Sequence, residues 1–245
     1  MNNVMKTIDI RKKLEELGAG VAEFHLGEFD FIGRFTAERT RDENHPLFKT
    51  AGMFYRANYE RGLLISQLIK SYKIESMLEI GFGRGYSTFC AAKTFCELGI
   101  HGKIVTIDPA FDKNHLNMLQ KVFPKEWFDC IEFRPGKSSD VLPTLNTRFD
   151  LVYIDGDHSY EATKHDWEAT KGMWNKCMLF DDYHLPSKNE PGIQCRDLID
   201  SIDDKTKELI IMDRRIFFDD RRIPDDQIDY GQVLLTNPEL LNVEW

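Results

Sequence analysis

Short apolar runs alternate along the chain with stretches that have the length and spacing of helices, from about residue 70 onward. This alternation predicts a parallel sheet whose two faces are covered by helices. We expect strands at residues 76–80, 104–107, 131–133, 151–154 and 178–180. We expect helices at residues 59–72, 87–98, 116–123, 138–145, 160–173 and 194–202.

Both ends of the chain depart from this alternation. Residues 208–218 and 232–235 have the pattern of two strands joined by a charged loop, which predicts an antiparallel pair at the sheet edge. With that pair, residues 57–245 are expected to form one α/β domain with a seven-stranded, mostly parallel sheet. Residues 1–56 are expected to be a separate segment: a helix at 8–17, then a lid, a dimer arm or irregular structure.

Composition narrows the classes of partner. The chain has 245 residues, of which 42% are hydrophobic and 30% charged, as is ordinary for a globular protein. Its net charge of −9 argues against nucleic acids and anionic membranes as main partners, because phosphate groups recruit Lys and Arg. No apolar run reaches the ~20 residues of a membrane span and no signal peptide is recognisable, so we expect a cytoplasmic protein.

A glycine-rich turn follows the first expected strand of the domain. The sequence around it has the pattern E-x-G-x-G-x-G, formed by Glu79, Gly81, Gly83 and Gly85. Glycines let a ligand approach the backbone closely, and the N–H groups at the start of the following helix suit an anionic group. A dinucleotide fingerprint would instead have its third glycine at Tyr86, so the spacing argues against a nicotinamide cofactor.

This turn resembles the first motif of class I S-adenosylmethionine (SAM)-dependent methyltransferases, which implies a Rossmann-like fold. The resemblance implies that the turn lies along the methionine part of SAM. It also implies that the acidic residue of the motif, Glu79, supports the loop. Asp108, 23 positions after Gly85, would hold the ribose hydroxyls, or else cap a loop. Ser138 would border the adenine, or else cap a helix. The expected SAM-binding residues are Glu79, Gly81, Gly83, Gly85, Ser87, Asp108, Ser138 and Asp155.

Acidic residues also follow the fourth and fifth expected strands of the domain. Asp155 and Asp157 follow one of these strands, and Asp181 and Asp182 follow the other. Ligands of open parallel sheets bind outside the carboxyl ends of the strands, so we expect these carboxylates to converge. Crowded carboxylates repel one another unless something offsets their charge, and a divalent cation with oxygen ligands would do so.

The pattern D-G-D-H-x-Y-E, with F-D-D-Y about 25 residues later, resembles a branch of metal-dependent small-molecule O-methyltransferases that includes enzymes acting on sugar hydroxyls of antibiotics. The resemblance implies Mg²⁺ bound by Asp155, Asp181 and Asp182. It leaves two candidates for the general base, of which His158 is preferred over Asp157 because an imidazole titrates near neutral pH. Alternatively, Asp157 and His158 cap the next helix, and Asp182 caps a loop.

The expected activity is therefore SAM-dependent, Mg²⁺-dependent O-methylation of a small-molecule hydroxyl on a sugar, polyol or natural product. Two alternatives stay open: a metal-independent small-molecule methyltransferase, and a SAM-binding protein without catalysis. We expect the acceptor to be contacted by the N-terminal segment, the loop at 186–192 and the C-terminal tail. The sequence leaves the oligomeric state open, a homo-oligomer included.

Overall fold

The computed structural model describes residues 5–19, 59–111, 113–184, 194–212 and 230–239, and the statements below concern these residues. They form one eight-stranded sheet in the order β1-β7-β8-β6-β5-β2-β3-β4. Strand β8 is antiparallel to both of its neighbours, β7 and β6, and the other strands run parallel to their neighbours. The expected mostly parallel α/β sheet with an antiparallel C-terminal pair is thus confirmed.

The strands are β1 Lys6–Asp9, β2 Ser76–Ile80, β3 Lys103–Asp108, β4 Ile131–Pro135, β5 Phe149–Ile154, β6 Trp174–His184, β7 Glu208–Ile211 and β8 Tyr230–Thr236. The α-helices are α1 Ile10–Glu16, α4 Tyr59–Tyr72, α5 Tyr86–Glu97, α6 Lys113–Val122, α7 Lys125–Asp129, α8 Ser138–Val141, α9 Tyr160–Thr170 and α10 Cys195–Ser201. A 3-10 helix, η3 Leu142–Thr144, follows α8. The short helix α7 was not among the expected elements.

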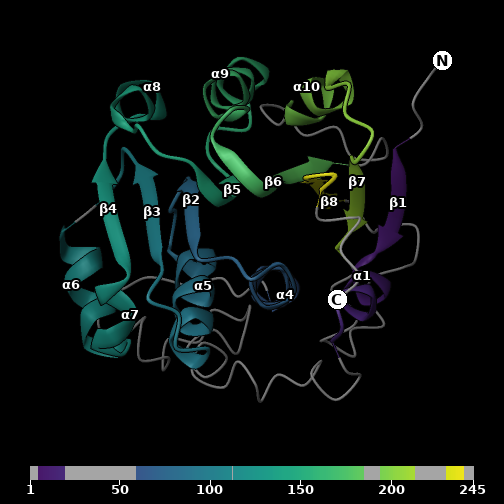
Figure 1. The fold of residues 1–245 in the computed structure, drawn as a ribbon. Helices are drawn as coiled ribbons and strands as arrows, with labels where there is room; N and C mark the ends of the chain where they lie inside the picture. Colours follow the sequence, from purple (N-terminus) through teal and green to yellow (C-terminus); the bar gives the residue numbers. More distant parts are fainter. Residues whose placement is uncertain (1–4, 20–58, 112, 185–193, 213–229, 240–245) are drawn as a thin grey trace, which may run out of the picture.

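Helices cover both faces of the sheet. In Figure 1, α8, α9 and α10 lie along the top, whereas α4, α5 and α7 lie in the lower half. Successive strand residues point to opposite faces: Met77 belongs to the core that contains Phe89 of α5, and Leu78 belongs to the core that contains Ile199 of α10. Because both faces of the sheet are buried, the sequences of its strands are continuous apolar runs rather than alternating apolar and polar residues.

The N-terminal residues contribute a strand that the sequence did not predict. Strand β1 pairs in parallel with β7 and makes the sheet eight-stranded rather than seven-stranded. The helix expected at 8–17 begins only at Ile10, because the side chain of Asp9 accepts the N–H of Lys12 (3.0 Å) and caps the first turn. Residues 20–56, the expected lid or dimer arm, lie outside the described residues.

Strand β6 is much longer than the three residues expected for it. It continues through both acidic residues to His184, with an irregularity in its pairing to β8 between Phe180 and Tyr183. Asp182 lies at this irregularity with a φ of 50°, which is unusual for a residue other than glycine. The acids therefore do not follow the strand, as the sequence suggested, but lie within it where its pairing is interrupted.

Within the described ranges, no helix is both long enough and apolar enough to cross a membrane.

Candidate active site

The glycine turn after β2 is tightly packed against the end of β5. Gly81 has a φ of 96°, and a Cβ atom there would lie 2.0 Å from the carbonyl oxygen of Asp155. The N–H of Gly81 donates to the carbonyl of Ile107 (2.8 Å), and the N–H of Asp155 donates to the carbonyl of Ile80 (2.8 Å). Only glycine fits this position, because both its φ and the close approach of the Asp155 backbone exclude a side chain.

Phe82 anchors the turn in the hydrophobic core. Its side chain is buried and packs against the rings of Phe111 and Phe133, with centroids 5.0 and 5.5 Å away. A Cβ atom on Gly85 would come within 2.4 Å of the Phe82 ring, so the third glycine makes room for this anchor. The glycine pattern in the sequence did not reveal the anchor, because it depends on which core residues surround the turn.

Glu79 lies behind the turn and is fully buried. Its carboxylate accepts hydrogen bonds from the hydroxyls of Ser87 (2.5 Å), Thr106 (2.6 Å) and Thr88. Burial raises the pKa of Glu79, and these three hydrogen bonds oppose that rise. Glu79 and Ser87 therefore connect the start of α5 to β2 and β3. A direct contact of either residue with the cofactor stays a prediction.

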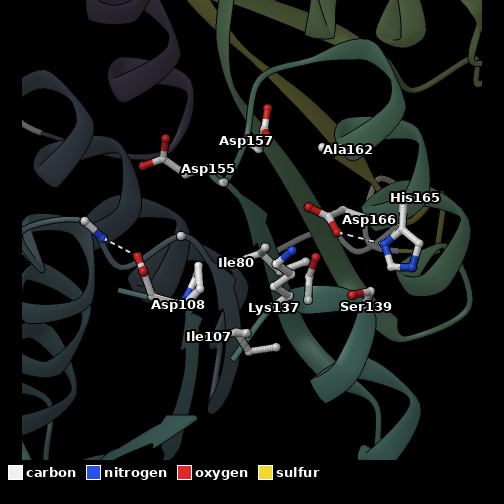
Figure 2. A pocket seen from close by; sticks show the side chains of 15 residues that line it. Ile80, Ile107, Asp108, Lys137, Ser139, Asp155, Asp157, Ala162, His165 and Asp166 are labelled. Carbon is white, nitrogen blue, oxygen red and sulfur yellow. Dashed lines mark hydrogen bonds and ion pairs between the residues drawn. The ribbon is translucent and has the colours of Figure 1, made fainter. Parts of the chain in front are cut away.

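A pocket of about 510 Å³ opens beside the turn, at the carboxyl ends of β2, β3 and β5 (Figure 2). Asp108 lies on one side of it, with one carboxylate oxygen accepting the N–H groups of Phe82 and Gly83 (2.9 Å each). Asp108 thus caps the glycine turn and also faces the pocket, so the two functions considered for it are compatible. Its contact with a ribose stays a prediction. The predicted cofactor-binding residues that line the pocket are Gly81, Gly83, Asp108, Ser138 and Asp155; Glu79, Gly85 and Ser87 do not.

Helix α9 supplies a wall of the pocket that the sequence did not predict. His165 and Asp166 lie across from Asp108 in Figure 2, with Asp166 Oδ1 3.2 Å from His165 Nδ1. Asp166 is 2% exposed. Burial raises the pKa of Asp166, and a hydrogen bond with Ser138 opposes the rise. The helical pattern predicted α9, but which of its turns borders a ligand depends on how the helix lies on the sheet.

Three of the four predicted acidic residues converge where β5 and β6 lie side by side. Arg61 of α4 bridges two of them: its Nη1 donates to Asp155 Oδ2 (3.0 Å) and its Nη2 donates to Asp181 Oδ2. The other oxygen of Asp181 accepts from the amide of Gln232 (2.8 Å) in β8. Arg61 and Gln232 were not predicted, because nothing in the sequence indicates that α4 and β8 meet the ends of these strands.

His158 lies on the other side of the same cluster. Its Nε2 is 3.2 Å from Asp182 Oδ2 and 3.9 Å from Asp155 Oδ1. Asp157 does not join the cluster, because one of its oxygens accepts the N–H of Ser159 (2.9 Å) before α9. The hydrogen bonds from Ser159 lower the pKa of Asp157, which makes it a weak base. The structure therefore places Asp157 in the turn before α9, whose N-cap is Ser159, and places His158 among the carboxylates.

The two carboxylates that share Arg61 are in different electrostatic states. Burial raises the pKa of Asp155 well above its usual value, more than the neighbouring guanidinium lowers it. For Asp181, burial also acts upward, but Arg61 and its hydrogen bonds hold the pKa below the usual value. The cluster therefore contains one carboxylate held ionised by its partners and a second that gains a proton more readily.

The side chains of this cluster do not fit a divalent cation in the arrangement observed. One oxygen of Asp155 and one of Asp181 are bound to Arg61, and the second Asp181 oxygen is bound to Gln232. Among the described residues, no group of three or more His, Cys, Asp or Glu side chains is arranged to hold a metal ion. The repulsion between carboxylates that suggested a metal is offset instead by a guanidinium of the chain itself.

Comparison with known proteins agrees with this fold. Residues 78–183 match a family model described as a methyltransferase domain. No curated protein matches the chain. Rv0187 from MTB, solved with its cofactor, is 19% identical, with a TM-score of 0.58 over 77% of this chain and 84% of that protein.

Two further solved structures have the same fold. The O-methyltransferase TomG from Streptomyces achromogenes, solved with SAM, is 16% identical, with a TM-score of 0.56 over 89% of this chain and 99% of that protein. The O-methyltransferase from Bacillus cereus, solved with SAH, is 15% identical, with a TM-score of 0.57 over 89% of this chain and 100% of that protein.

The sheet order and the glycine turn agree with the methyltransferase domain whose family model matches residues 78–183. The matched residues, 78–183, include the glycine turn, the residues that line the pocket and the acids of the cluster. The predicted methyltransferase is thereby confirmed at the level of the domain that these residues match.

Proposed function

We propose that this chain transfers the methyl group of SAM to a hydroxyl of a small molecule such as a sugar, a polyol or a natural product. The observation that carries the proposal is the position of Asp155. Its side chain lines the pocket beside the glycine turn and also belongs to the cluster that contains His158. A donor pocket thus adjoins a group able to accept a proton. The neighbours described as O-methyltransferases support the same reaction class.

The methyl donor would extend along the pocket from the glycine turn to α9. Gly83 has a φ of 53° and open space where a Cβ would lie, so its backbone is accessible to the methionine part. Asp108 would accept the ribose hydroxyls, and Ser138 would border the adenine. Burying the donor between the turn and α9 would fix its position relative to the acceptor, and such alignment contributes several kcal/mol to methyl transfer.

His158 would act as the general base. The hydroxyl proton would pass to the imidazole as the hydroxyl oxygen attacks the methyl carbon in line with the departing sulfur. Asp182, 3.2 Å from His158 Nε2, would orient the ring and stabilise the imidazolium that forms. The pKa of Asp157 is lowered by its hydrogen bonds, so that carboxylate is the weaker candidate.

Replacement of the two candidate bases tests this assignment. We expect His158→Ala to lower kcat by about 100-fold or more and to remove the acidic limb of the pH–rate profile. Asp157→Asn should chiefly weaken the hydrogen bond to the Ser159 N–H in the turn before α9, by about 1 kcal/mol of stability, and leave the pH–rate profile unchanged. A full loss of kcat in Asp157→Asn, with His158→Ala active, would reverse the assignment.

Dependence on magnesium stays a prediction from the resemblance, with Asp155, Asp181 and Asp182 as its ligands. The contacts of Arg61 favour the second candidate, a metal-independent methyltransferase, because they occupy oxygens that the ion would need. A location in the cytoplasm, the absence of nucleic-acid or membrane partners, and the oligomeric state also stay predictions. The acceptor contacts expected from the N-terminal segment, the loop at 186–192 and the C-terminal tail also stay predictions. Of these segments, the structure describes residues 5–19, 208–212 and 230–239.

The experiment that tests the proposal combines binding with turnover. Isothermal titration with SAH measures the donor site, and labelled SAM with a panel of sugars, polyols and phenolic natural products measures methyl transfer with EDTA or with Mg²⁺. We expect binding of SAH and transfer to an oxygen acceptor. Binding without transfer to any acceptor would favour a SAM-binding protein without catalysis, and transfer only to nitrogen or carbon would contradict the reaction class.

A further inference from the structure

Arg61 occupies the centre of the acidic cluster between β5 and β6. Its side chain is 13% exposed, and its two terminal nitrogens bind one oxygen each of Asp155 and Asp181. From this geometry we propose that the Arg61 guanidinium is the resident cation of the acidic cluster and serves there in place of a divalent metal ion. The inference concerns the site of the proposed function. What Arg61 contributes to catalysis therefore rests on that function.

The first argument is steric. A metal ion that bridges Asp155 and Asp181 through the oxygens that Arg61 now bridges would displace the guanidinium, and the other Asp181 oxygen is already bound to Gln232. Around it, Asp181 is 1% exposed and Gln232 is fully buried. Moving a guanidinium out of such surroundings breaks charge-assisted hydrogen bonds that are not recovered elsewhere in the buried site. The ion would have to compensate for that loss before gaining any affinity.

The second argument concerns charge. With Arg61 in place, the carboxylates of Asp155, Asp181 and Asp182 still exceed its single positive charge. The remaining negative charge suits the sulfonium of SAM, whose proposed pocket Asp155 lines. A divalent cation in addition to Arg61 would cancel the negative charge that remains and so remove the attraction for the sulfonium. Because its charge is single rather than double, the guanidinium leaves more negative charge for a cationic donor than a metal ion in its place would.

The third argument is that the fold brings Arg61 to this position through its neighbour, Gly62. A Cβ atom on Gly62 would lie 2.8 Å from Cys90 Sγ and 2.9 Å from the Tyr86 hydroxyl, so glycine lets α4 approach α5 closely. This close approach holds the first turn of α4 against the carboxyl ends of the strands. Arg61 is therefore a positioning residue, which fixes the carboxylates around the donor and the base.

Titration with Mn²⁺, followed by electron paramagnetic resonance, tests the proposal without any substrate. We expect the wild-type protein to bind no stoichiometric Mn²⁺ at this cluster, with or without SAH. In Arg61→Gln the carboxylates lose their cation, so Mn²⁺ should bind at least about tenfold more tightly than in wild type. Adding Asp181→Asn to that variant should abolish the new binding. Arg134→Gln, which removes an exposed arginine from its pair with Glu132, is the matched control and should resemble wild type.

Stoichiometric binding of Mn²⁺ to wild type with micromolar affinity, lost in Asp155→Asn, would overturn the proposal. If Arg61→Gln fails to fold, Arg61→Lys keeps the positive charge and should remain as indifferent to Mn²⁺ as wild type; tight binding by it would also count against the proposal. The titration does not depend on turnover. If the chain transfers no methyl group to a hydroxyl, the proposed function fails, while the Mn²⁺ result still decides whether Arg61 excludes the ion.

Discussion

Asp181 has both carboxylate oxygens occupied, one by Arg61 and the other by Gln232. Its chemistry is therefore set by two residues that are 120 and 51 positions away in the sequence. At the scale of single residues, the sequence identified the acids and the histidine of this site but not their partners. The function of a buried polar side chain depends on the groups that form its hydrogen bonds, and here those groups come from distant elements.

Gly81 gives a sharp prediction at the same scale. In Gly81→Ala the new methyl group would collide with the Asp155 carbonyl, and the φ of 96° would strain any side chain. We expect a loss of about 3 kcal/mol or more in the free energy of unfolding, measured by urea denaturation, together with loss of SAH binding.

The control for this prediction is Gly99→Ala, also at a positive φ (65°) but with open space where the Cβ would lie. It should cost only about 1 kcal/mol and leave SAH binding intact. Equal destabilisation by the two substitutions would mean that the contact between the turn and β5 contributes nothing.

At the scale of elements, β1 and α1 extend the sheet beyond the strands that form the site. Their attachment to β7 depends on Glu208, whose carboxylate is 2.5 Å from Lys13 Nζ of α1 and 2.6 Å from Lys6 Nζ of β1. Lys13 and Glu208 are both buried. Because a buried charge is costly without its partner, this pair fixes where the N-terminal elements join the sheet.

This ion pair predicts a pH dependence of stability. Burial alone would raise the pKa of Glu208, but Lys13 and Lys6 lower it below its ordinary value of 4.5. A lowered pKa in the folded state contributes stability above pH 4.5, and that contribution is lost as the pH falls through the folded-state pKa. Near neutral pH, we expect Glu208→Gln to lower the free energy of unfolding by about 3 kcal/mol.

Urea denaturation between pH 7 and pH 3 checks the prediction. The difference between wild type and Glu208→Gln should shrink as the pH falls below 4.5. Glu16→Gln is the control, because the half-exposed Glu16 contacts the same two lysines at 3.3 and 3.6 Å and should contribute less than about 1 kcal/mol. A difference that stays constant over the whole pH range would exclude Glu208 as the titrating group.

At the scale of the whole molecule, the site joins elements from most of the described chain. The pocket is lined from the glycine turn, the ends of β3 and β5, and helices α8 and α9, while α4 and β8 hold the acidic cluster. A ligand in this pocket bridges parts that are far apart in sequence. Binding is therefore expected to stabilise the entire domain rather than one loop.

Thermal unfolding with and without SAH measures how much binding stabilises the whole domain. At a concentration of about 100 times its Kd, a ligand that binds only the folded state adds about 2.7 kcal/mol, which raises Tm by roughly 5–10 °C for a domain of this size. Asp108→Asn should reduce the shift by at least about half, because Asp108 both faces the pocket and caps the turn. An unchanged shift in that variant would mean that Asp108 does not contact the ligand.

The sequence by itself determined the alternation of strands and helices, the glycine turn and the acids near the strand ends. These features are local: an apolar run, a positive φ and a chain position are each encoded within a few residues. The sequence also indicated the class of protein, since the glycine spacing and the acid patterns lie within the segment that matches a methyltransferase domain.

Only the tertiary structure decided which charges meet. It placed Arg61 between Asp155 and Asp181, His158 beside Asp182 and the unpredicted β1 at the sheet edge. These contacts join elements far apart in the chain, and their partners are selected by how helices and strands pack rather than by local sequence. The crowded carboxylates that indicated a metal in the sequence are, in the folded protein, neutralised in part by an arginine.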